Sequence, residues 1–324
     1  LLGDPALKLN IPSDYQVKTT TQLDTLNALS VQTIQGYIQT EEGDTATWFN
    51  GKLDITVLDK MQQITTRDND EMNESNKVKI TYNDYPNTLF SGKTNVVDGK
   101  FEMTFMVPKD IRYNYGAGRI VYYAYDEENR EEAMGHFEDF IIGGSSTVEA
   151  KDSIGPELHI YLNNPAFMDG DATYEFPHFY ADIYDENGIN TVGTGIGHDL
   201  LLVIDSDPKQ TYVLNDYFSA SNNSYQQGQV SYKMTEQTEG MHTLTFRAWD
   251  LYNNSSIASL NFQVIRGMDP QIYKVVTYPN PVANTESLNI QIEYDQPDEV
   301  IQTAIYLYDI SGKLVLTHQQ KGTE

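Results

Sequence analysis

The chain contains no cysteine among its 324 residues. It therefore forms no disulfide, offers no thiolate ligand to a metal and carries no cysteine nucleophile. Basic side chains are also scarce, because 21 Lys and Arg stand against 47 Asp and Glu and the formal net charge is −26. A field this negative repels phosphate backbones and anionic lipid, which argues against nucleic-acid binding and against docking on an anionic membrane surface.

Long apolar runs are missing as well. No run reaches the roughly 18 residues that a membrane-spanning helix needs, so no transmembrane segment is predicted. The first residues, Leu1 to Pro5, include neither an initiator Met nor the charged stretch and apolar core of a signal peptide. The last residues, Lys321 to Glu324, follow directly on an apolar, strand-like run. We therefore expect the chain to be an internal piece of a longer protein.

What the chain does contain is a long series of short segments with β-strand periodicity. Hydrophobic residues make up 39% of the chain, and 23 Tyr stand beside 12 Phe and 2 Trp. Apolar residues alternate with polar ones, or run unbroken over strand lengths, between turn-forming Gly, Asn, Asp and Pro. The segments are 53–58, 77–82, 101–107, 120–125, 158–162, 200–204 and 244–249. The best candidate for a helix, Val17 to Leu29, is rich in Thr and is predicted to be a connector. The pattern favours an all-β fold built from tandem immunoglobulin-like antiparallel sandwiches.

Two halves of the chain repeat a set of anchor residues in the same order. The first set is Tyr125, Asp126, Asn129 and Gly143, and the second is Trp249, Asp250, Asn253 and Gly267. Two upstream pairs accompany them, 51–59 with 197–205, and Phe90 plus 99–101 with Phe218 plus 228–230. The aromatic-Asp-x-x-Asn element is typical of a strand that ends in a turn, where the carboxylate accepts backbone N–H groups and Asn tolerates a left-handed conformation. We interpret the repeat as two copies of one sandwich domain.

The repeat and the linkers between its copies predict four pieces. Residues 1–29 form a tail and connector, 30–145 the first sandwich, 146–267 the second sandwich, and 268–324 a partial β-rich domain. The linker between the sandwiches is the small, polar stretch Gly143-Gly144-Ser145-Ser146-Thr147. The second copy opens at Asp152 to Pro156.

No set of residues for nucleophilic catalysis is visible, so we predict no catalytic and no cofactor-binding residue. No Gly-x-Ser-x-Gly motif occurs, and no pair among the six His has metal-ligand spacing. His198 follows the Gly-rich stretch 193–197, but that stretch lacks the Lys-Ser/Thr ending of a phosphate loop. Acid–base pairs among the 47 carboxylates are not excluded by sequence. A solvated acidic surface is the simpler interpretation.

Oxygen-rich loops leave one candidate cofactor, a structural Ca²⁺. Hard cations take carboxylate, amide and carbonyl oxygens as ligands. The loops are 68–71, 126–129, 169–171 and 185–188, and none has EF-hand spacing. The candidate ligands are Asp185, Asn187, Asp126 and Asn129.

Both ends of the chain resemble known sequences. Leu1-Leu2-Gly3-Asp4-Pro5-Ala6-Leu7 resembles the end of the caspase-like catalytic domain of gingipain-type cysteine peptidases. Tyr278-Pro279-Asn280-Pro281-Val282 and the run 305–315, with its Asp-Ile-Ser-Gly-Lys turn, resemble the C-terminal sorting domain of type IX secretion substrates in Bacteroidetes. In that domain, Tyr-Pro-Asn-Pro opens the first strand and the Asp-x-x-Gly turn forms a central hairpin. The segments 185–190, 195–199, 214–217, 240–244 and 248–255 resemble the region that follows the catalytic domain in the type IX sortase.

This resemblance implies a non-catalytic C-terminal region of a gingipain-like peptidase or sortase. The catalytic His and Cys of the family lie upstream, so no catalytic residue is assigned here. The resemblance implies an extracellular location, at the cell surface or secreted. Its implied partners are the upstream catalytic domain and components of the type IX secretion system or outer membrane. The residues that carry the family motifs are Gly3, Asp4, Pro5, His198, Asp199, Trp249, Asp250, Asn253, Tyr278, Pro279, Asn280, Pro281, Asp309 and Gly312.

A second class of function stays open beside this one. The chain also fits a surface adhesin or glycan-binding β-sandwich module, in which Tyr-rich strand faces make the contacts. The two interpretations differ in what the parent protein carries upstream of Leu1, since only the peptidase interpretation requires a catalytic His and Cys there.

Overall fold

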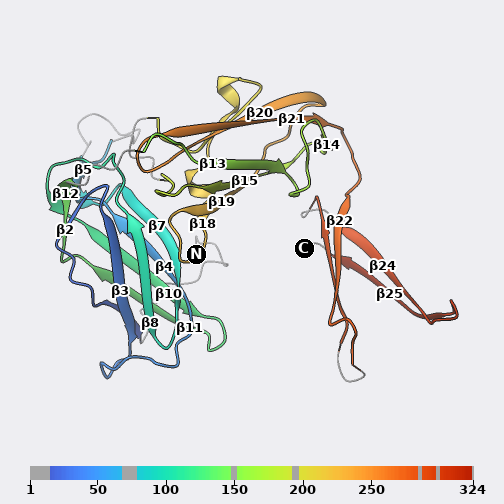
Figure 1. Cartoon of the computed structure of the whole chain (residues 1–324), viewed down its shortest axis with the longest axis horizontal. Coiled ribbons are helices and arrows are strands. Elements are labelled where there is room, and N and C mark those ends of the chain that lie inside the picture. Colours follow the sequence, from blue (N-terminus) through green and yellow to red (C-terminus); the bar gives the residue numbers. More distant parts are fainter. Residues whose placement is uncertain are drawn as a thin grey trace.

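A computed structural model describes residues 15–67, 79–146, 152–191, 197–283, 287–296 and 300–322. Within them the chain is built from β-strands, with short 3-10 turns at Pro208–Gln210 and Asn215–Tyr217 and no α-helix. The predicted all-β class is therefore confirmed. Figure 1 shows three parts, in which a first sandwich and two C-terminal hairpins extend to the same side of a second sandwich.

The first sandwich curls one large sheet around a core. The sheet order is β7 (Thr88–Val96), β4 (Gly51–Leu58), β10 (Arg119–Asp126), β11 (Glu131–Phe137), β1 (Tyr15–Thr19), β3 (Val31–Gln39) and β8 (Lys100–Met106). The end strands β7 and β8 are joined by a tight hairpin in which Val97 and Lys100 exchange backbone hydrogen bonds of 2.9 Å. The two ends of the sheet are thus brought back together, and the inward side chains are enclosed.

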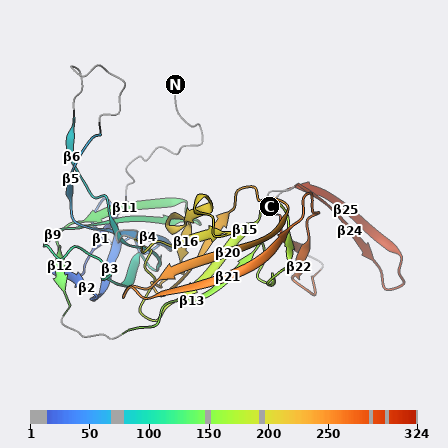
Figure 2. The same cartoon turned by 90° about the horizontal axis from the view of Figure 1, so that it is seen from above.

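Smaller sheets complete this part. One has the order β2 (Thr25–Ala28), β12 (Ile141–Ser145) and β9 (Gly116–Ala117). Strands β5 (Gln62–Thr65) and β6 (Thr81–Asp84) form an arm that projects from the sandwich in Figure 2.

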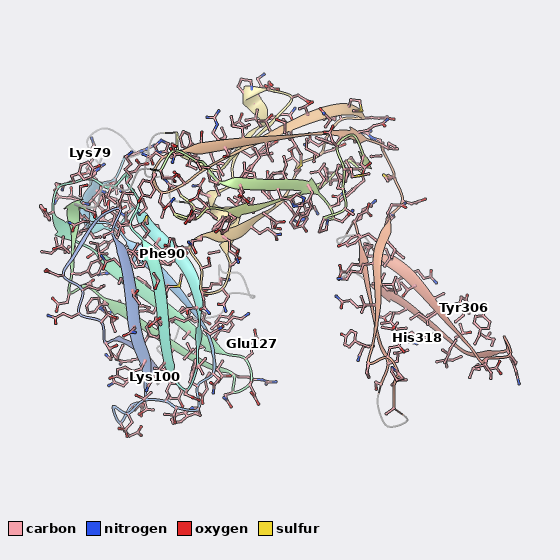
Figure 3. The ribbon with its side chains drawn as sticks, in the orientation of Figure 1. Lys79, Phe90, Lys100, Glu127, Tyr306 and His318 are labelled. Carbon is pink, nitrogen blue, oxygen red and sulfur yellow. The ribbon has the colours of Figure 1, made fainter. Side chains whose placement is uncertain are left out.

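Period-2 alternation explains which residues fill the core. On β4, Leu53, Ile55 and Val57 are fully buried while the side chains between them are half-buried. On the other side of the core, Phe105 of β8 stacks on Phe90 of β7 with ring centroids 4.9 Å apart. Figure 3 shows Phe90 at this position. The alternation seen in the sequence is therefore the alternation between core and surface.

The structure corrects two predictions about connecting segments. The predicted connector, Val17 to Leu29, instead contributes β1, which pairs with both β3 and β11, and β2, which pairs with β12. Val17 and Leu26 are buried in the first core. The predicted linker also begins inside a strand, because Ile141–Ser145 is β12 and Ser145 pairs with Ala28. The N-terminal motif residues Gly3, Asp4 and Pro5, and linker residue Thr147, lie outside the described residues.

The second sandwich packs a four-stranded sheet on a five-stranded sheet. The first has the order β13 (Glu157–Leu162), β15 (His178–Tyr184), β19 (Gln227–Lys233) and β18 (Phe218–Ala220). The second has the order β14 (Ala172–Thr173), β21 (Ser255–Val264), β20 (Gly240–Trp249), β16 (Leu201–Ile204) and β17 (Thr211–Val213). Phe179 from one sheet meets Phe246 from the other, with ring centroids 5.3 Å apart. The two inner faces therefore form one apolar core between them.

The internal repeat corresponds in part to equivalent strands. In the first sandwich β4 pairs with β10, and in the second β16 pairs with β20; β10 and β20 both end at the aromatic-Asp pair. Each then forms an antiparallel hairpin with the next strand, β11 or β21. The third predicted anchor is wrong, because Phe90 lies on β7 beside β4 whereas Phe218 lies on β18 in the opposite sheet from β16.

The last part consists of two separate hairpins. Strands β22 (Ile272–Tyr278) and β23 (Asn289–Tyr294) form one, and β24 (Ile301–Tyr308) and β25 (Leu314–Gly322) form the other. Figure 3 shows Tyr306 and His318 on the second hairpin, away from both sandwiches. The expectation that Tyr278-Pro279-Asn280-Pro281 opens the first strand is wrong. Tyr278 is the last residue of β22, and the other three residues of the motif follow the strand.

A candidate cation site at the joint between the sandwiches

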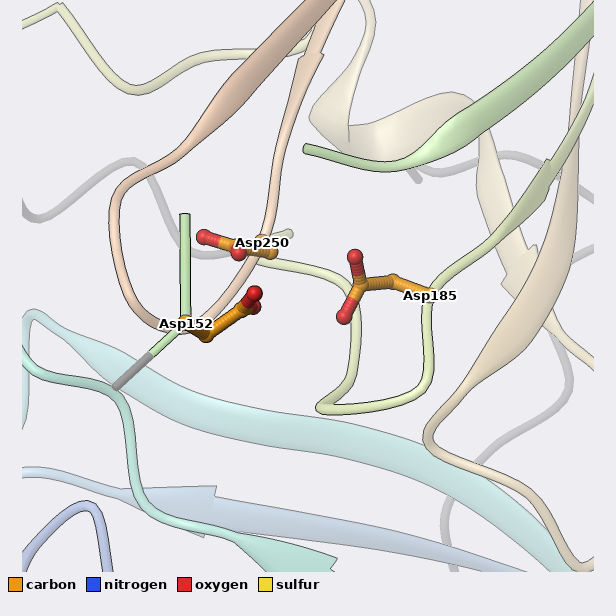
Figure 4. A group of neighbouring side chains, drawn as sticks. All are labelled: Asp152, Asp185 and Asp250. Atoms are coloured by element: carbon orange, nitrogen blue, oxygen red, sulfur yellow. The ribbon is translucent and has the colours of Figure 1, made fainter. Parts of the chain in front are cut away.

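Three carboxylates from separate segments meet where the second sandwich approaches the first. Asp185 follows β15, Asp250 follows β20, and Asp152 precedes β13. One oxygen of each lies within 4.8 Å of the others. Asp250 is fully buried, Asp185 is 6% exposed and Asp152 is half-buried. Figure 4 shows the three side chains as neighbours, with Asp152 below Asp250 and the carboxylate of Asp185 pointing toward these two from the right.

Turn geometry places each of these carboxylates. The Asp250 Oδ1 atom accepts the N–H groups of Tyr252 and Asn254 at 3.0 and 2.6 Å, and its Oδ2 accepts the Asn254 side-chain amide at 2.7 Å. Asp185 Oδ1 accepts the Asn187 N–H at 2.8 Å. The predicted role of Asp250 as a turn acceptor is confirmed, and Asn253 adopts the predicted left-handed conformation with φ 73°.

Asp152 completes the group from the start of the second sandwich. Its Oδ1 atom accepts the N–H of Ile154 at 3.0 Å, and its Oδ2 accepts the Asn187 amide at 2.9 Å. It also shares a hydrogen bond with Asp250. The candidate ligand Asn187 therefore links two of the three carboxylates, because its backbone N–H donates to Asp185 and its side-chain amide donates to Asp152.

Burial sets the protonation of the cluster. It raises the pKa of Asp185 to about 6, a shift that the Asn187 N–H opposes and the charges of Asp250 and Asp152 increase. Burial likewise raises the pKa of Asp250 to about 6, against the Asn254 hydrogen bonds and with support from Asp152. Burial also disfavours the charged form of Asp152, but hydrogen bonds from Ile154, Asp250, Ser153 and Asn187 outweigh it and the pKa is lowered. Asp152 therefore ionises first, and the two buried partners resist ionisation beside it.

Such a cluster has two chemically reasonable ways to lose its excess charge. It can keep a proton shared between carboxylates, or it can bind a hard cation, because carboxylate oxygens are the ligands that Ca²⁺ prefers. The donor set fits a divalent cation in type and spacing. A structural Ca²⁺ at this place stays a prediction.

The other oxygen-rich loops serve as turns elsewhere. Asp126 accepts the N–H groups of Asn50, Glu128 and Asn129 and the Asn129 amide, at 2.8 to 3.1 Å, at the end of β10. The positive φ in that turn belongs to Arg130 and not to Asn129, contrary to the expectation for the first copy. Asp169 binds Asn261, and residues 68–71 lie outside the described residues. The candidates Asp126 and Asn129 are thus separate from Asp185 and Asn187.

Several family-motif residues instead join the two sandwiches. Asp110 of the first sandwich accepts the Asn253 amide at 2.6 Å, and it also hydrogen-bonds to Nδ1 of His198. The His198 ring lies on Trp249, with centroids 4.4 Å apart. Asp199 lies half-buried just before β16.

Asp309 and Gly312 form the predicted hairpin turn, in which Asp309 Oδ1 accepts the N–H groups of Ser311 and Lys313.

The joint is extended by apolar and backbone contacts. Met106 of the first sandwich packs with Leu251 and Tyr252 of the second. The Lys109 N–H donates to the Leu251 carbonyl at 3.1 Å. A second contact between the sandwiches lies at the edge strand β7, where the Asn223 N–H donates to the Lys93 carbonyl at 2.8 Å.

Sequence reasoning missed two of these residues. Asp152 was placed only at the opening of the second sandwich, and Asp110 was not singled out. The segment Asp152 to Pro156 has the sequence Asp-Ser-Ile-Gly-Pro, which is typical of a turn. An Asp at the start of such a turn accepts the N–H groups that follow it, so this segment carries a usable signal for Asp152. No local signal marks Asp110, because its partners are 88 and 143 residues away.

No protein-family model matches the chain, and a search of curated proteins gives no match. Among solved structures, the crystal structure of dimeric latent PorU from Porphyromonas gingivalis is 32% identical, over 99% of this chain and 30% of that one, with a TM-score of 0.49. The chain is therefore similar in sequence to part of PorU, and it spans about 30% of the PorU chain that it matches.

Two more distant structures are similar only in part. A tetra-tandem repeat from the extending region of a large adhesion protein is 14% identical over 95% of this chain and 62% of that one, with a TM-score of 0.22. Spo0M, a sporulation control protein from Bacillus subtilis, is 14% identical over 69% and 91%, with a TM-score of 0.25. Neither bears on the function of this chain. The described part of the chain includes no helix that is both long and apolar enough to span a membrane.

Proposed function

We propose that this chain is the non-catalytic C-terminal β-region of a gingipain-type cysteine peptidase that resembles PorU. The observation that carries the proposal is the 32% identity to PorU over 99% of the chain. The absence of cysteine supports a non-catalytic role, since a cysteine peptidase would keep its nucleophile in another part of the protein. In this proposal the parent protein acts outside the cell, on the surface or after secretion. The division near residues 145 and 267 remains part of the proposal, and the first sandwich also includes β1 and β2, which precede residue 30.

The first task that we assign to the region is to brace the catalytic domain. A brace must transmit rigidity, and the joint between the two sandwiches combines Asp110, the Met106 contact and the Asn223 edge contact. Neighbouring domains move relative to one another unless contacts hold them, so the proposed brace depends on these three contacts. The first sandwich follows directly on the proposed catalytic tail, so it is the part that would contact that domain.

The second task is to contact partners through the two C-terminal hairpins. Isolated two-stranded hairpins are marginally stable in water. The β24–β25 hairpin exposes Tyr306, Leu307, Tyr308 and Leu314 by 47% to 57%. A secretion component or a second copy of the chain would cover this surface, and the PorU structure is described as dimeric. Sedimentation velocity of the chain, alone and at rising concentration, separates self-association from contact with a different partner.

The full gene gives the first test of this function. We expect it to encode a catalytic His and Cys upstream of Leu1, and we expect the full-length protein, but not this chain alone, to cleave a peptide substrate. Upstream sequence without that pair would overturn the proposal, and so would peptidase activity from the chain alone.

Bracing has its own test in the full-length enzyme. Phe105→Ala weakens the first core, so the temperature at which peptidase activity is lost should fall if the catalytic domain depends on that sandwich. Tyr113→Ala, at a residue 55% exposed, is the matched control. A first sandwich that melts early while peptidase stability stays unchanged would contradict bracing without affecting the assignment to the family.

A further inference from the structure

The outer face of the four-stranded sheet in the second sandwich carries an unusual set of side chains. This face lies on the side of the second sandwich toward which the first sandwich and the hairpins extend (Figure 1). A solvated sheet face usually carries long charged and small polar residues. Here the outward positions of β13 and β15 are dominated by rings. These are His159, Tyr161, His178, Tyr180 and Tyr184, of which Tyr161 is buried and the others are half-buried or exposed.

Strand register sorts these residues into rows. Glu157, Tyr184 and Gln227 form the first row; His159, Asp182 and Gln229 form the second. Tyr161, Tyr180 and Ser231 form the third. Successive rows are about 7 Å apart, because same-face residues are two positions apart along a strand. A polar row is thus bordered on each side by a row with tyrosine.

Hydrogen bonds hold the polar row in place. The Gln229 amide donates to Asp182 Oδ1 at 2.6 Å and lies 3.1 Å from the Tyr161 hydroxyl. His159 Nδ1 lies 3.4 Å from Asp182 Oδ2. On the third row, Tyr161 and Tyr180 stack with centroids 5.3 Å apart. The polar groups are therefore oriented before any ligand arrives, which reduces the entropy that binding costs.

The first and second rows line a hollow. Its volume is about 560 Å³, and its lining includes Glu157, His159, Asp182, Tyr184 and Gln229. That volume lies within the range of small-ligand sites. Tyr184 is 44% exposed and His159 is exposed, so both rings offer surface to a ligand.

We propose that this hollow binds two adjacent sugar units of a neutral oligosaccharide. A pyranose ring presents C–H groups on its face, which pack on Tyr184 and His159. The hydroxyls on its rim donate to the carboxylates of Asp182 and Glu157 and to the carbonyl oxygen of Gln229. The row spacing of about 7 Å accommodates one sugar per row. An acidic sugar is disfavoured by Glu157, by Asp182 and by the net charge of −26.

Cross-strand stacking of rings also stabilises a sheet, so the test must separate ligand binding from folding. The probes are neutral trisaccharides of glucose, mannose, galactose and N-acetylglucosamine, with sialyllactose as the acidic probe and tetralysine as the basic one. Binding to the whole 324-residue chain is measured by saturation-transfer NMR and then by calorimetry. Tyr184→Ala and Gln229→Ala remove contacts in the hollow. Tyr123→Ala, at a residue 37% exposed on the first sandwich, is the matched control.

We expect at least one neutral trisaccharide to bind, and Tyr184→Ala or Gln229→Ala to weaken it about tenfold, as loss of a central contact does. The control variant should bind as the unaltered chain does, with all melting temperatures close together. The proposal is overturned if no neutral probe binds, if the hollow variants bind as tightly as the control, or if tetralysine or sialyllactose is the preferred probe. This test does not depend on the catalytic domain, so its result is separate from that of the proposed function.

Discussion

Replacing Asp185 by asparagine tests the electrostatics of the joint most directly. In the Asp185→Asn variant, the side-chain carbonyl would still accept the Asn187 N–H, while the new amide group would face the other two carboxylates as a donor. The substitution removes one charge and keeps the shape of the side chain. It therefore isolates the cost of ionising a third carboxylate in a buried group.

The magnitude follows from the raised pKa. The pKa of Asp185 is raised from 3.8 to about 6 in the folded chain. Each unit corresponds to about 1.4 kcal/mol, so ionising Asp185 costs the folded state up to about 3 kcal/mol. The folded chain binds this proton more tightly than the unfolded chain does. Stability from this group is thus present below pH 4 and is lost as the pH rises through 6.

Asp185→Asn should therefore stabilise the second sandwich at pH 8 by about 1 to 3 kcal/mol and leave its stability near pH 4 unchanged. Urea unfolding in EDTA buffer, followed by Trp249 fluorescence in a Trp48→Phe background, reports on that sandwich alone. Equal stability of the two chains at pH 8, or an equal effect at pH 4 and pH 8, would refute the reasoning.

Calcium gives the same experiment a second arm. Anything that binds only the folded chain stabilises it in proportion to the logarithm of its concentration over Kd. If the cluster holds Ca²⁺, the ion should stabilise the unaltered chain at pH 8 and have little effect on Asp185→Asn. If the cluster holds only a shared proton, Ca²⁺ should leave both chains unchanged. The two outcomes decide between the two ways of neutralising the cluster.

Three further substitutions test the fold and the joint. Asp110→Ala leaves the Asn253 amide and His198 without their acceptor and should broaden the distance distribution between the sandwiches in small-angle X-ray scattering; an unchanged distribution would show that the apolar contact alone fixes the joint. Phe105→Ala should destabilise the first sandwich by about 3 to 5 kcal/mol in urea unfolding followed by Trp48, and a loss below ~1 kcal/mol would contradict its place in the core. Gly51→Ala would place a Cβ 2.0 Å from the carbonyl oxygen of Tyr125, so the first sandwich should lose stability in thermal unfolding, and a neutral result would mean that β4 and β10 can separate there.

The sequence predicts the strands that contain their own signal. Residues 53–58 and 120–125 alternate strongly, and they became β4 and β10. Strand β1 could not be predicted in this way, because it is short and its place depends on pairing with β11, more than 100 residues later. Its five residues include one buried side chain, Val17, which is too little alternation to show which face is buried. Pairing between distant segments supplied what local periodicity lacked.

The candidate site was likewise predictable only in part from the sequence. The sequence predicts Asp250 as a turn acceptor and places Asp185 in an oxygen-rich loop, because both precede residues typical of turns. Their proximity was not predictable, since three loops from different places in the second sandwich must first be brought together. The raised pKa values follow from that burial and not from any motif.

The Asp250 turn connects the charge of the cluster to the geometry of the joint. The carboxylate of Asp250 holds the turn by accepting the N–H groups of Tyr252 and Asn254. The residues inside that turn, Leu251 to Asn253, are the ones that contact Met106, Lys109 and Asp110 of the first sandwich. A change in charge at the cluster therefore acts on the segment that fixes the orientation of the two sandwiches. If Asp185→Asn stabilises the second sandwich at pH 8, the same variant should also narrow the distance distribution between the sandwiches at that pH.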